Sequence, residues 1–226
     1  MKFVHERIQE PLFLDDHFCI LSVENPSFLR SFQLELRQQL DGFEGGFALS
    51  DGDKSHVIAQ CAALISDPFD LVINDRRTLL TAHASLIRLA EERGMDIRLL
   101  DVSRQLMDFM DELIQDEPFF VMGMEQLNVK DCLKCLDVHL SVNAEQNYFD
   151  QFMDFLLIKI KFANKKLFVC NGLSAYITTD ELLELQRFAV REDIEILVVE
   201  GVLSEKWQQI PIKTIIIDDD LCEIVK

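Results

Sequence analysis

Apolar and polar residues repeat along the chain with two different periods, which predict its secondary structure. The apolar run Phe18–Val23 has the composition of a buried strand. Asn25-Pro26 then predicts a helix start, because Asn is a favoured N-cap and Pro fits the first helical position. Apolar residues follow at helical spacing until the glycines of segment 42–46: Phe28, Leu29, Phe32, Leu36 and Leu40. This part therefore predicts a strand, a turn and a helix.

The middle of the chain has the pattern of long amphipathic helices. Five apolar residues recur there at steps of three and four: Leu99, Val102, Leu106, Phe109 and Leu113. A second long helix is predicted over residues 144–163, with five residues inward: Phe149, Phe152, Phe155, Leu156 and Ile160. Such stripes fit helices that pack on each other within the chain, or a helical excursion that pairs with a second subunit.

The last third predicts strands that alternate with a helix. Leu167–Cys170, Ile194–Val199 and Ile212–Ile217 are short runs in which most residues are apolar. Between the first two, Thr178 and Glu181 have the spacing of a capping box that opens a helix. Strands that are apolar on both faces indicate a parallel sheet covered on both sides. The sequence therefore predicts an α/β fold with a mostly parallel sheet. Residues 1–75 and 164–226 would form the head, and residues 76–163 a helical subdomain.

Charge complicates any prediction of a partner. The chain has 226 residues, of which 40 are acidic and 22 basic, so its formal net charge is −18. This average argues against a nucleic-acid binder, because phosphate neutralisation requires clustered Lys and Arg. Binding depends on local potential, however, so a basic inner face on an acidic body stays open.

The sequence also predicts a cytoplasmic protein without a membrane segment. Lys2, His5 and Glu6 interrupt the opening residues, so no signal peptide is recognised. No apolar run approaches the roughly 20 residues of a membrane span. Four cysteines lie inside apolar segments, as is typical of reduced core thiols: Cys19, Cys61, Cys170 and Cys222.

Catalytic motifs are incomplete. The segment Gly46–Ser55 resembles a phosphate-binding loop but has one residue too many between its glycines and places Asp53 before Lys54, so a polar turn is favoured. Glu200 and Asp218 end two predicted strands, where carboxylates of nucleotide hydrolases hold Mg²⁺. Without a phosphate loop they are a weak indication.

Two further motifs each lack a required residue. Gly172-Leu173-Ser174-Ala175-Tyr176 lies where a nucleophile elbow would be, but no histidine follows it, which excludes the hydrolase order Ser…Asp…His. Cys132, Cys135 and His139 have no evident fourth zinc ligand, so packed thiols are favoured over a metal site.

Two charged groups are candidate binding sites. Lys130 and Lys134 stand one turn apart on a predicted helix, and the densest basic stretch of the chain contains Lys159, Lys161, Lys165 and Lys166. They could hold a duplex backbone without reading bases, although salt bridging to the acidic surplus is the plainer interpretation. Four carboxylates gather near a predicted helix end: Glu112, Asp116, Glu117 and Glu125. Hard cations such as calcium prefer such oxygen ligands, whereas the plainer interpretation is a solvated acidic surface.

The order and spacing of several short motifs, together with the length of the chain, resemble those of a known family. The features of the last third are Lys165-Lys166, a strand ending at Asn171, Gly172 in the turn, Tyr176, and a capped helix before a strand closing at Glu200. The amino-terminal part agrees through Glu10-Pro11, the strand over residues 20–23, Glu24 and a helix beginning near Phe28. The chain is similar to the small ring-forming adaptation protein of type II-A CRISPR systems, the Csn-two family.

The resemblance implies a fold and a function. The family is similar to nucleotide hydrolases in its α/β head but lacks a working phosphate loop (Walker A motif). Its members form homotetrameric rings, bind calcium through acidic residues of the helical part, and thread linear double-stranded DNA through a lysine-lined hole. They take part in spacer acquisition alongside the CRISPR integrase and the RNA-guided nuclease. The six lysines would then contact DNA, and Glu112, Asp116, Glu117 and Glu125 would hold calcium.

The expected function is therefore sequence-independent, non-catalytic binding of double-stranded DNA or its ends by a homotetrameric ring. One alternative is a nucleotide phosphohydrolase that holds Mg²⁺ at Glu200 and Asp218. The other is a scaffold that binds proteins through its acidic surface and does not contact DNA.

Overall fold

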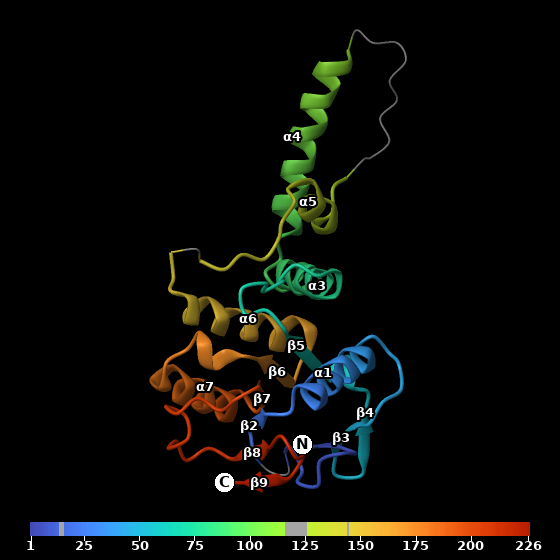
Figure 1. Cartoon of the computed structure of the whole chain (residues 1–226). Coiled ribbons are helices and arrows are strands. Elements are labelled where there is room, and N and C mark those ends of the chain that lie inside the picture. Colours follow the sequence, from blue (N-terminus) through green and yellow to red (C-terminus); the bar gives the residue numbers. More distant parts are fainter. Residues whose placement is uncertain (14–15, 116–125, 144) are drawn as a thin grey trace. The chain divides into compact units, whose positions relative to one another are not determined.

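The computed structural model describes residues 1–226 except 14–15, 116–125 and 144. The chain divides into two compact units (Figure 1). The sheet unit comprises residues 1–72 and 142–226, and the helical unit comprises residues 73–141. None of the described helices is long and apolar enough to cross a membrane.

A six-stranded sheet forms the centre of the sheet unit. Its strands, in spatial order, are β5 (Ala62–Ile65), β6 (Leu167–Asn171), β7 (Glu195–Glu200), β2 (Phe18–Val23), β8 (Thr214–Ile217) and β9 (Glu223–Val225). The first five are parallel to one another, and β9 pairs with β8 in the antiparallel sense. The predicted mostly parallel α/β sheet is therefore confirmed, and β2 lies in its interior.

Helix α1 (Pro26–Leu40) covers one face of this sheet. It begins as predicted, because the side chain of Asn25 accepts from the backbone amides of Ser27 and Phe28 while Pro26 occupies the first turn. Its apolar stripe joins one buried cluster with alternate strand residues such as Leu21 and Val199. Burying this stripe provides most of the helix stability, because such helices are marginal in isolation.

The opposite face buries the other alternate residues of the same strands, such as Phe168 and Ile196. Helix α7 (Thr179–Glu192) contacts β7 there. The predicted capping box is present: Thr178 accepts from the amide of Glu181, whose carboxylate accepts from the amide of Thr178.

Helix α6 (Tyr148–Ala163) belongs to the sheet unit. It starts at Tyr148, whereas the sequence predicted a helix from residue 144, which lies outside the described residues. Four of the five predicted inward residues are buried, namely Phe149, Phe152, Phe155 and Leu156, and Ile160 is half-buried. The boundary predicted at residue 163 thus differs from the structure, because these residues pack within the sheet unit.

Three strands of the sheet unit form a separate small antiparallel sheet: β1 (Lys2–His5), β3 (Phe47–Asp51) and β4 (Lys54–His56). The short helix α2 (Ile58–Cys61) leads from it into β5. The segment that resembled a phosphate loop is the hairpin of β3 and β4, in agreement with the predicted turn. Gly52 in this turn has φ 54°, a left-handed conformation that favours glycine.

The helical unit contains α3 (Arg76–Glu92), α4 (Asp96–Ile114) and α5 (Val129–Cys135). Asp75 caps α3 by accepting from the amides of Arg77 and Thr78, and α3 contacts α5. The predicted stripe of apolar residues does form a helix, α4, but most of the stripe is exposed.

Candidate functional site

Two of the predicted DNA-contacting lysines lie at one edge of the sheet unit. Lys161 is exposed in the last turn of α6, which ends at Asn164 in the left-handed conformation (φ 53°). The chain then turns directly into β6. The backbone of Lys166 donates to Cys61 and accepts from Glu195, so Lys166 is fixed between β5 and β7. Its side chain is exposed at the amino ends of the parallel strands.

Lys159 and Lys165 have local partners instead. Lys159 is only 8% exposed, and its ammonium lies 5.4 Å from the centroid of the Phe155 ring. The ammonium of Lys165 donates to the carbonyl of Ala59 at 2.8 Å. In a single chain these two lysines support packing. Lys161 and Lys166 are exposed, and the ammonium of Lys161 lies 5.1 Å from the centroid of the Phe162 ring.

The other two predicted lysines belong to the helical unit. Asn128 caps α5 by accepting from the amide of Asp131. Lys130 and Lys134 follow one turn apart on this helix, and both are exposed. Their spacing suits two phosphates of one backbone strand or one shared phosphate.

The predicted calcium ligands are only partly described. Glu112 is exposed in the last turn of α4. Asp116, Glu117 and Glu125 lie outside the described residues. Over the described ranges, no three Asp, Glu, His or Cys side chains come close enough to hold a metal ion. The described residues therefore do not assemble a calcium site.

The carboxyl ends of the strands carry a buried carboxyl group. Glu200 ends β7, and its two oxygens accept from the amide of Ser174 at 2.8 Å and from its hydroxyl at 2.9 Å. Burial raises the pKa of Glu200 above its ordinary value, and the two bonds from Ser174 only partly oppose this. Asp218 accepts from the amide of Cys222. Both carboxyl groups proposed for Mg²⁺ thus hold local backbone in place.

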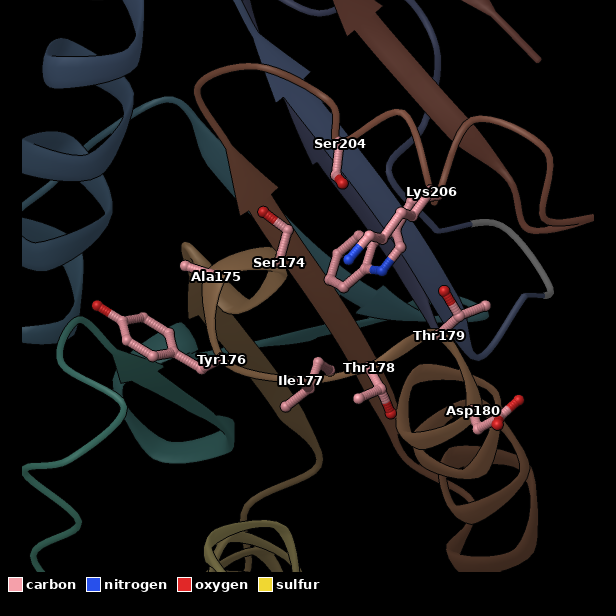
Figure 2. A pocket seen from close by; sticks show the side chains of 10 residues that line it. Ser174, Ala175, Tyr176, Ile177, Thr178, Thr179, Asp180, Ser204 and Lys206 are labelled. Carbon is pink, nitrogen blue, oxygen red and sulfur yellow. The ribbon is translucent and has the colours of Figure 1, made fainter.

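A pocket of about 490 Å³ opens beside this edge (Figure 2). Its wall follows residues 174–180 from the turn after β6 into α7, and Ser204, Lys206 and Trp207 complete it. The hydroxyls of Ser174 and Thr178 already bond to Glu200 and Glu181. No histidine lines the pocket, so Ser174 has no imidazole base there. The wall offers hydrogen bonding and one exposed cation, but no nucleophile–base pair.

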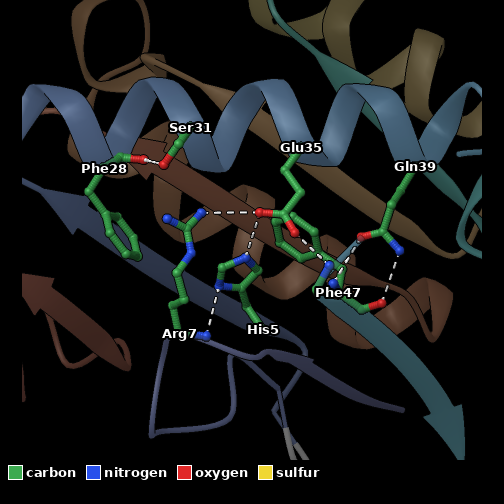
Figure 3. Close-up of polar contacts among 8 residues, drawn as sticks. His5, Arg7, Phe28, Ser31, Glu35, Gln39 and Phe47 are labelled. Atoms are coloured by element: carbon green, nitrogen blue, oxygen red, sulfur yellow. Dashed lines mark hydrogen bonds and ion pairs between the residues drawn. The ribbon is translucent and has the colours of Figure 1, made fainter. Parts of the chain in front are cut away.

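The structure brings together a polar network that the sequence analysis missed (Figure 3). Glu35 of α1 accepts from the amide of Gly46, from Arg7 at 3.1 Å and from His5 Nε2 at 3.2 Å. His5 Nδ1 accepts from the amide of Arg7, so the ring carries its proton on Nε2. Burial of His5 lowers its pKa, although Glu35 opposes this.

Glu35 itself is held ionised. Burial alone would raise the pKa of Glu35, but the amide of Gly46, then His5 and Arg7, outweigh it, so the pKa lies below its ordinary value. The network ties α1 to the small sheet. It is enclosed by aromatic rings, with Phe47 at 4.4 Å from the His5 ring.

The cysteine motif has no metal geometry. Cys132 and Cys135 lie on α5 as free thiols. His139 Nδ1 interacts with the carbonyl of Asp137, two residues away. Cys132 is half-buried, but Cys135 is exposed, so the predicted packing of these thiols is wrong for Cys135.

These features define an α/β protein with a mostly parallel sheet, an inserted helical unit and exposed lysines. Residues 39–221, well over half of the chain, match the family model described as CRISPR-associated protein (Cas_Csn2). The chain therefore belongs to the type II-A CRISPR-associated Csn2 family. No curated protein matches it.

Proposed function

We propose that the chain assembles into a homotetrameric ring that holds double-stranded DNA without reading its sequence, and that it does so during CRISPR spacer acquisition. The CRISPR integrase and the RNA-guided nuclease would be its working partners. Family membership supports the CRISPR role. The observation that carries the DNA part is the set of exposed lysines in each unit: Lys130, Lys134, Lys161 and Lys166.

The acidic net charge of the chain is the reason for proposing a closed ring rather than a single DNA-binding chain. A single chain with a net charge of −18 repels a duplex on average, and a few lysines per chain cannot reverse that at long range. A closed homo-oligomer repeats every lysine in each subunit around one axis. If these lysines face the axis, the inner surface attracts phosphates while the acidic exterior keeps rings apart.

The proposed binder is non-catalytic. Glu200 and Asp218 bond to Ser174 and Cys222, and the segment that resembled a phosphate loop is a β-hairpin. These observations count against the phosphohydrolase alternative. They leave the protein-binding scaffold as the function that remains if DNA is not bound.

The test compares a short linear duplex with the same duplex closed into a circle, at 50 and 200 mM salt, while light scattering records the protein mass. Threading predicts binding of the linear form only, by a tetramer, with affinity falling by about 10³-fold or more between these salt concentrations. Equal binding of both forms would contradict threading. No binding at 50 mM salt would contradict DNA holding and favour the scaffold.

Individual lysines can be tested with a matched control. Lys166→Gln should weaken binding of every duplex alike and lower the slope of log affinity against log salt by about 1 for each phosphate that is no longer neutralised. Lys54→Gln removes another exposed lysine, from the β3–β4 hairpin, and should change neither quantity. Equal effects of both substitutions would show that only total charge matters.

A further inference from the structure

Another pocket opens at the carboxyl ends of β5, β6 and β7, within the sheet unit. Its volume is about 390 Å³, and residues 174–176 also line the pocket of Figure 2. It is lined by Asn171, which ends β6, and by Glu200, which ends β7, together with Gln33 of α1 and Ser66 after β5. The carboxyl edge of an open parallel sheet is the usual place for a ligand in α/β folds.

This pocket has hydrogen-bond acceptors that the chain itself does not use. The amide oxygen of Asn171 is buried and accepts no hydrogen bond from a described residue. A buried acceptor without a donor is costly, so each one calls for an explanation. Glu200 is only 5% exposed, and Ser174 supplies one donor to each of its oxygens. A carboxylate offers about four lone-pair sites, so Glu200 retains capacity for a ligand that brings donors.

The charge of the pocket favours a cation over an anion. Among the described residues that line it, Glu200 is the one with a charged form at neutral pH, and there is no Lys, Arg or His. The exposed Asp67 lies between the lining residues Ser66 and Pro68 and adds negative charge nearby. A phosphate group would therefore be repelled here, whereas a cation would be attracted.

An aromatic side chain forms part of the pocket wall. Tyr176 is 45% exposed, and Figure 2 shows its ring directed away from Lys206 of the neighbouring pocket. The ring meets the Phe69 ring edge to face, with centroids 5.0 Å apart, and Phe69 in turn lies 5.3 Å from the Tyr148 ring. An aromatic ring beside a carboxylate attracts organic cations. For a metal ion, by contrast, the described residues assemble no set of three ligands.

We propose that this pocket binds a guanidinium group, either of a small molecule or of an arginine side chain. A guanidinium is planar and carries five N–H donors, so it can bond to Glu200 and Asn171 and also stack on Tyr176. An ammonium has three donors and no flat face. The site goes beyond the proposed function, because it lies at the carboxyl ends of the strands, whereas Lys166 lies at their amino ends.

The first test titrates the full-length chain at pH 8 with n-butylguanidinium and with n-butylurea, its neutral isostere, in a calorimeter. Butylguanidinium should bind, and butylurea should bind about tenfold more weakly or worse because it lacks the charge. Equal affinities, or no binding of butylguanidinium, would overturn the proposal. A blocked Gly-Arg-Gly peptide then identifies the source of the group. Tighter binding of the peptide indicates an arginine side chain, and weaker binding indicates a small molecule.

The second test changes the pocket. Glu200→Gln keeps the shape of the side chain and should lower the affinity for butylguanidinium about tenfold or more. Tyr176→Leu removes the ring and should lower it about two- to fivefold. Asp180→Asn is the control, because it removes an exposed carboxylate that lines only the neighbouring pocket, and its affinity should equal that of the wild type. Equal losses in Glu200→Gln and Asp180→Asn would overturn the proposal.

The pH dependence distinguishes a direct contact from a structural effect. Burial raises the pKa of Glu200, and Ser174 partly opposes this. Wild-type affinity for butylguanidinium should therefore fall as pH falls through that pKa, and Glu200→Gln should lack this dependence. The same pH dependence in both proteins would overturn the role of Glu200. DNA affinity should be unchanged in Glu200→Gln, so failure of this site and failure of DNA binding are measured separately.

Discussion

Glu35 should be the carboxylate on which the sheet unit depends most at neutral pH. Replacing it by Gln keeps its shape but removes the charge that three donors face. A hydrogen bond to a charged group contributes about 1.5–3 kcal/mol, and the bond from the amide of Gly46 survives in weakened form. The pair with Arg7 is partly exposed and contributes under about 1 kcal/mol.

The bond from His5 is the one that Gln cannot replace simply. Its Nε2–H would face an amide N–H₂ group if the Gln oxygen keeps the Gly46 bond. Rotating the amide by 180° restores the bond from His5 but breaks the bond from the amide of Gly46. Together these losses give about 2 kcal/mol, which lowers the urea midpoint by about 1 M.

Trp207 makes the assay specific. It is the only tryptophan, it is buried, and it belongs to the same unit as Glu35, so its fluorescence reports unfolding of the sheet unit. Glu35→Gln should unfold about 1 M earlier in urea at pH 7.5. Glu44→Gln, a substitution of an exposed glutamate, serves as the control, and its urea midpoint should equal that of the wild type.

The pH dependence gives an independent check. The folded pKa of Glu35 is depressed, so its contribution is present above the unfolded pKa of about 4.3 and is lost as pH falls through the folded pKa. The stability difference between Glu35→Gln and the wild type should therefore shrink at acid pH. Equal midpoints at pH 7.5, or a difference that grows at pH 4, would refute this reasoning.

Three further predictions concern the sheet unit. The pKa of His5 is lowered in the folded state, so the wild type should lose stability as pH falls below about 6.5, and His5→Phe should flatten that part of the curve in urea titrations. Glu200 has a raised folded pKa, so its contribution is lost as pH rises. Glu200→Gln, whose amide can still bond to Ser174, should gain stability relative to wild type as pH rises above the unfolded pKa of about 4.3; a constant difference would contradict this. Thr178→Ala removes the α7 cap and should cost about 1 kcal/mol in the same titration, whereas no change would mean that the cap is dispensable.

The elements that the sequence predicted correctly are those with local signals. Asn25-Pro26 and the Thr178–Glu181 spacing fix helix starts within four residues, so neighbouring side chains decide them. The strand Phe18–Val23 is buried on both faces, and its apolar run, which only Ser22 interrupts, predicted it. Such signals do not require knowledge of distant contacts.

The small antiparallel sheet was missed because its signal is short. Phe3 with His5, and Phe47 with Leu49, alternate with period two over only four or five residues. The network around Glu35 was missed for another reason. His5 and Glu35 are 30 residues apart, and only the pairing of β1 with β3 beside α1 brings them together.

The predicted DNA-contacting lysines also show that sequence alone does not reveal contacts made in the folded chain. The sequence identified six lysines by their density, but density does not tell a solvent-facing ammonium from one packed on Phe155. Lys159 follows Phe155 by one turn of α6, so it shares the buried side of that helix. The helical spacing was visible in the sequence, but the side of the helix that is buried near its end was not.

The strand order has a consequence for synthesis on the ribosome. β2 is translated early, yet its two neighbours are β7 and β8: Phe18 pairs with Ile196, and Val23 pairs with Ile217. At about 5–20 residues per second, β2 waits on the order of 10 to 40 s for β7 to be made. The helical unit, residues 73–141, is continuous in the chain and can fold during that interval. The nascent chain should therefore carry a folded helical unit before its sheet exists, and its unpaired apolar strand is the segment that a chaperone would need to protect.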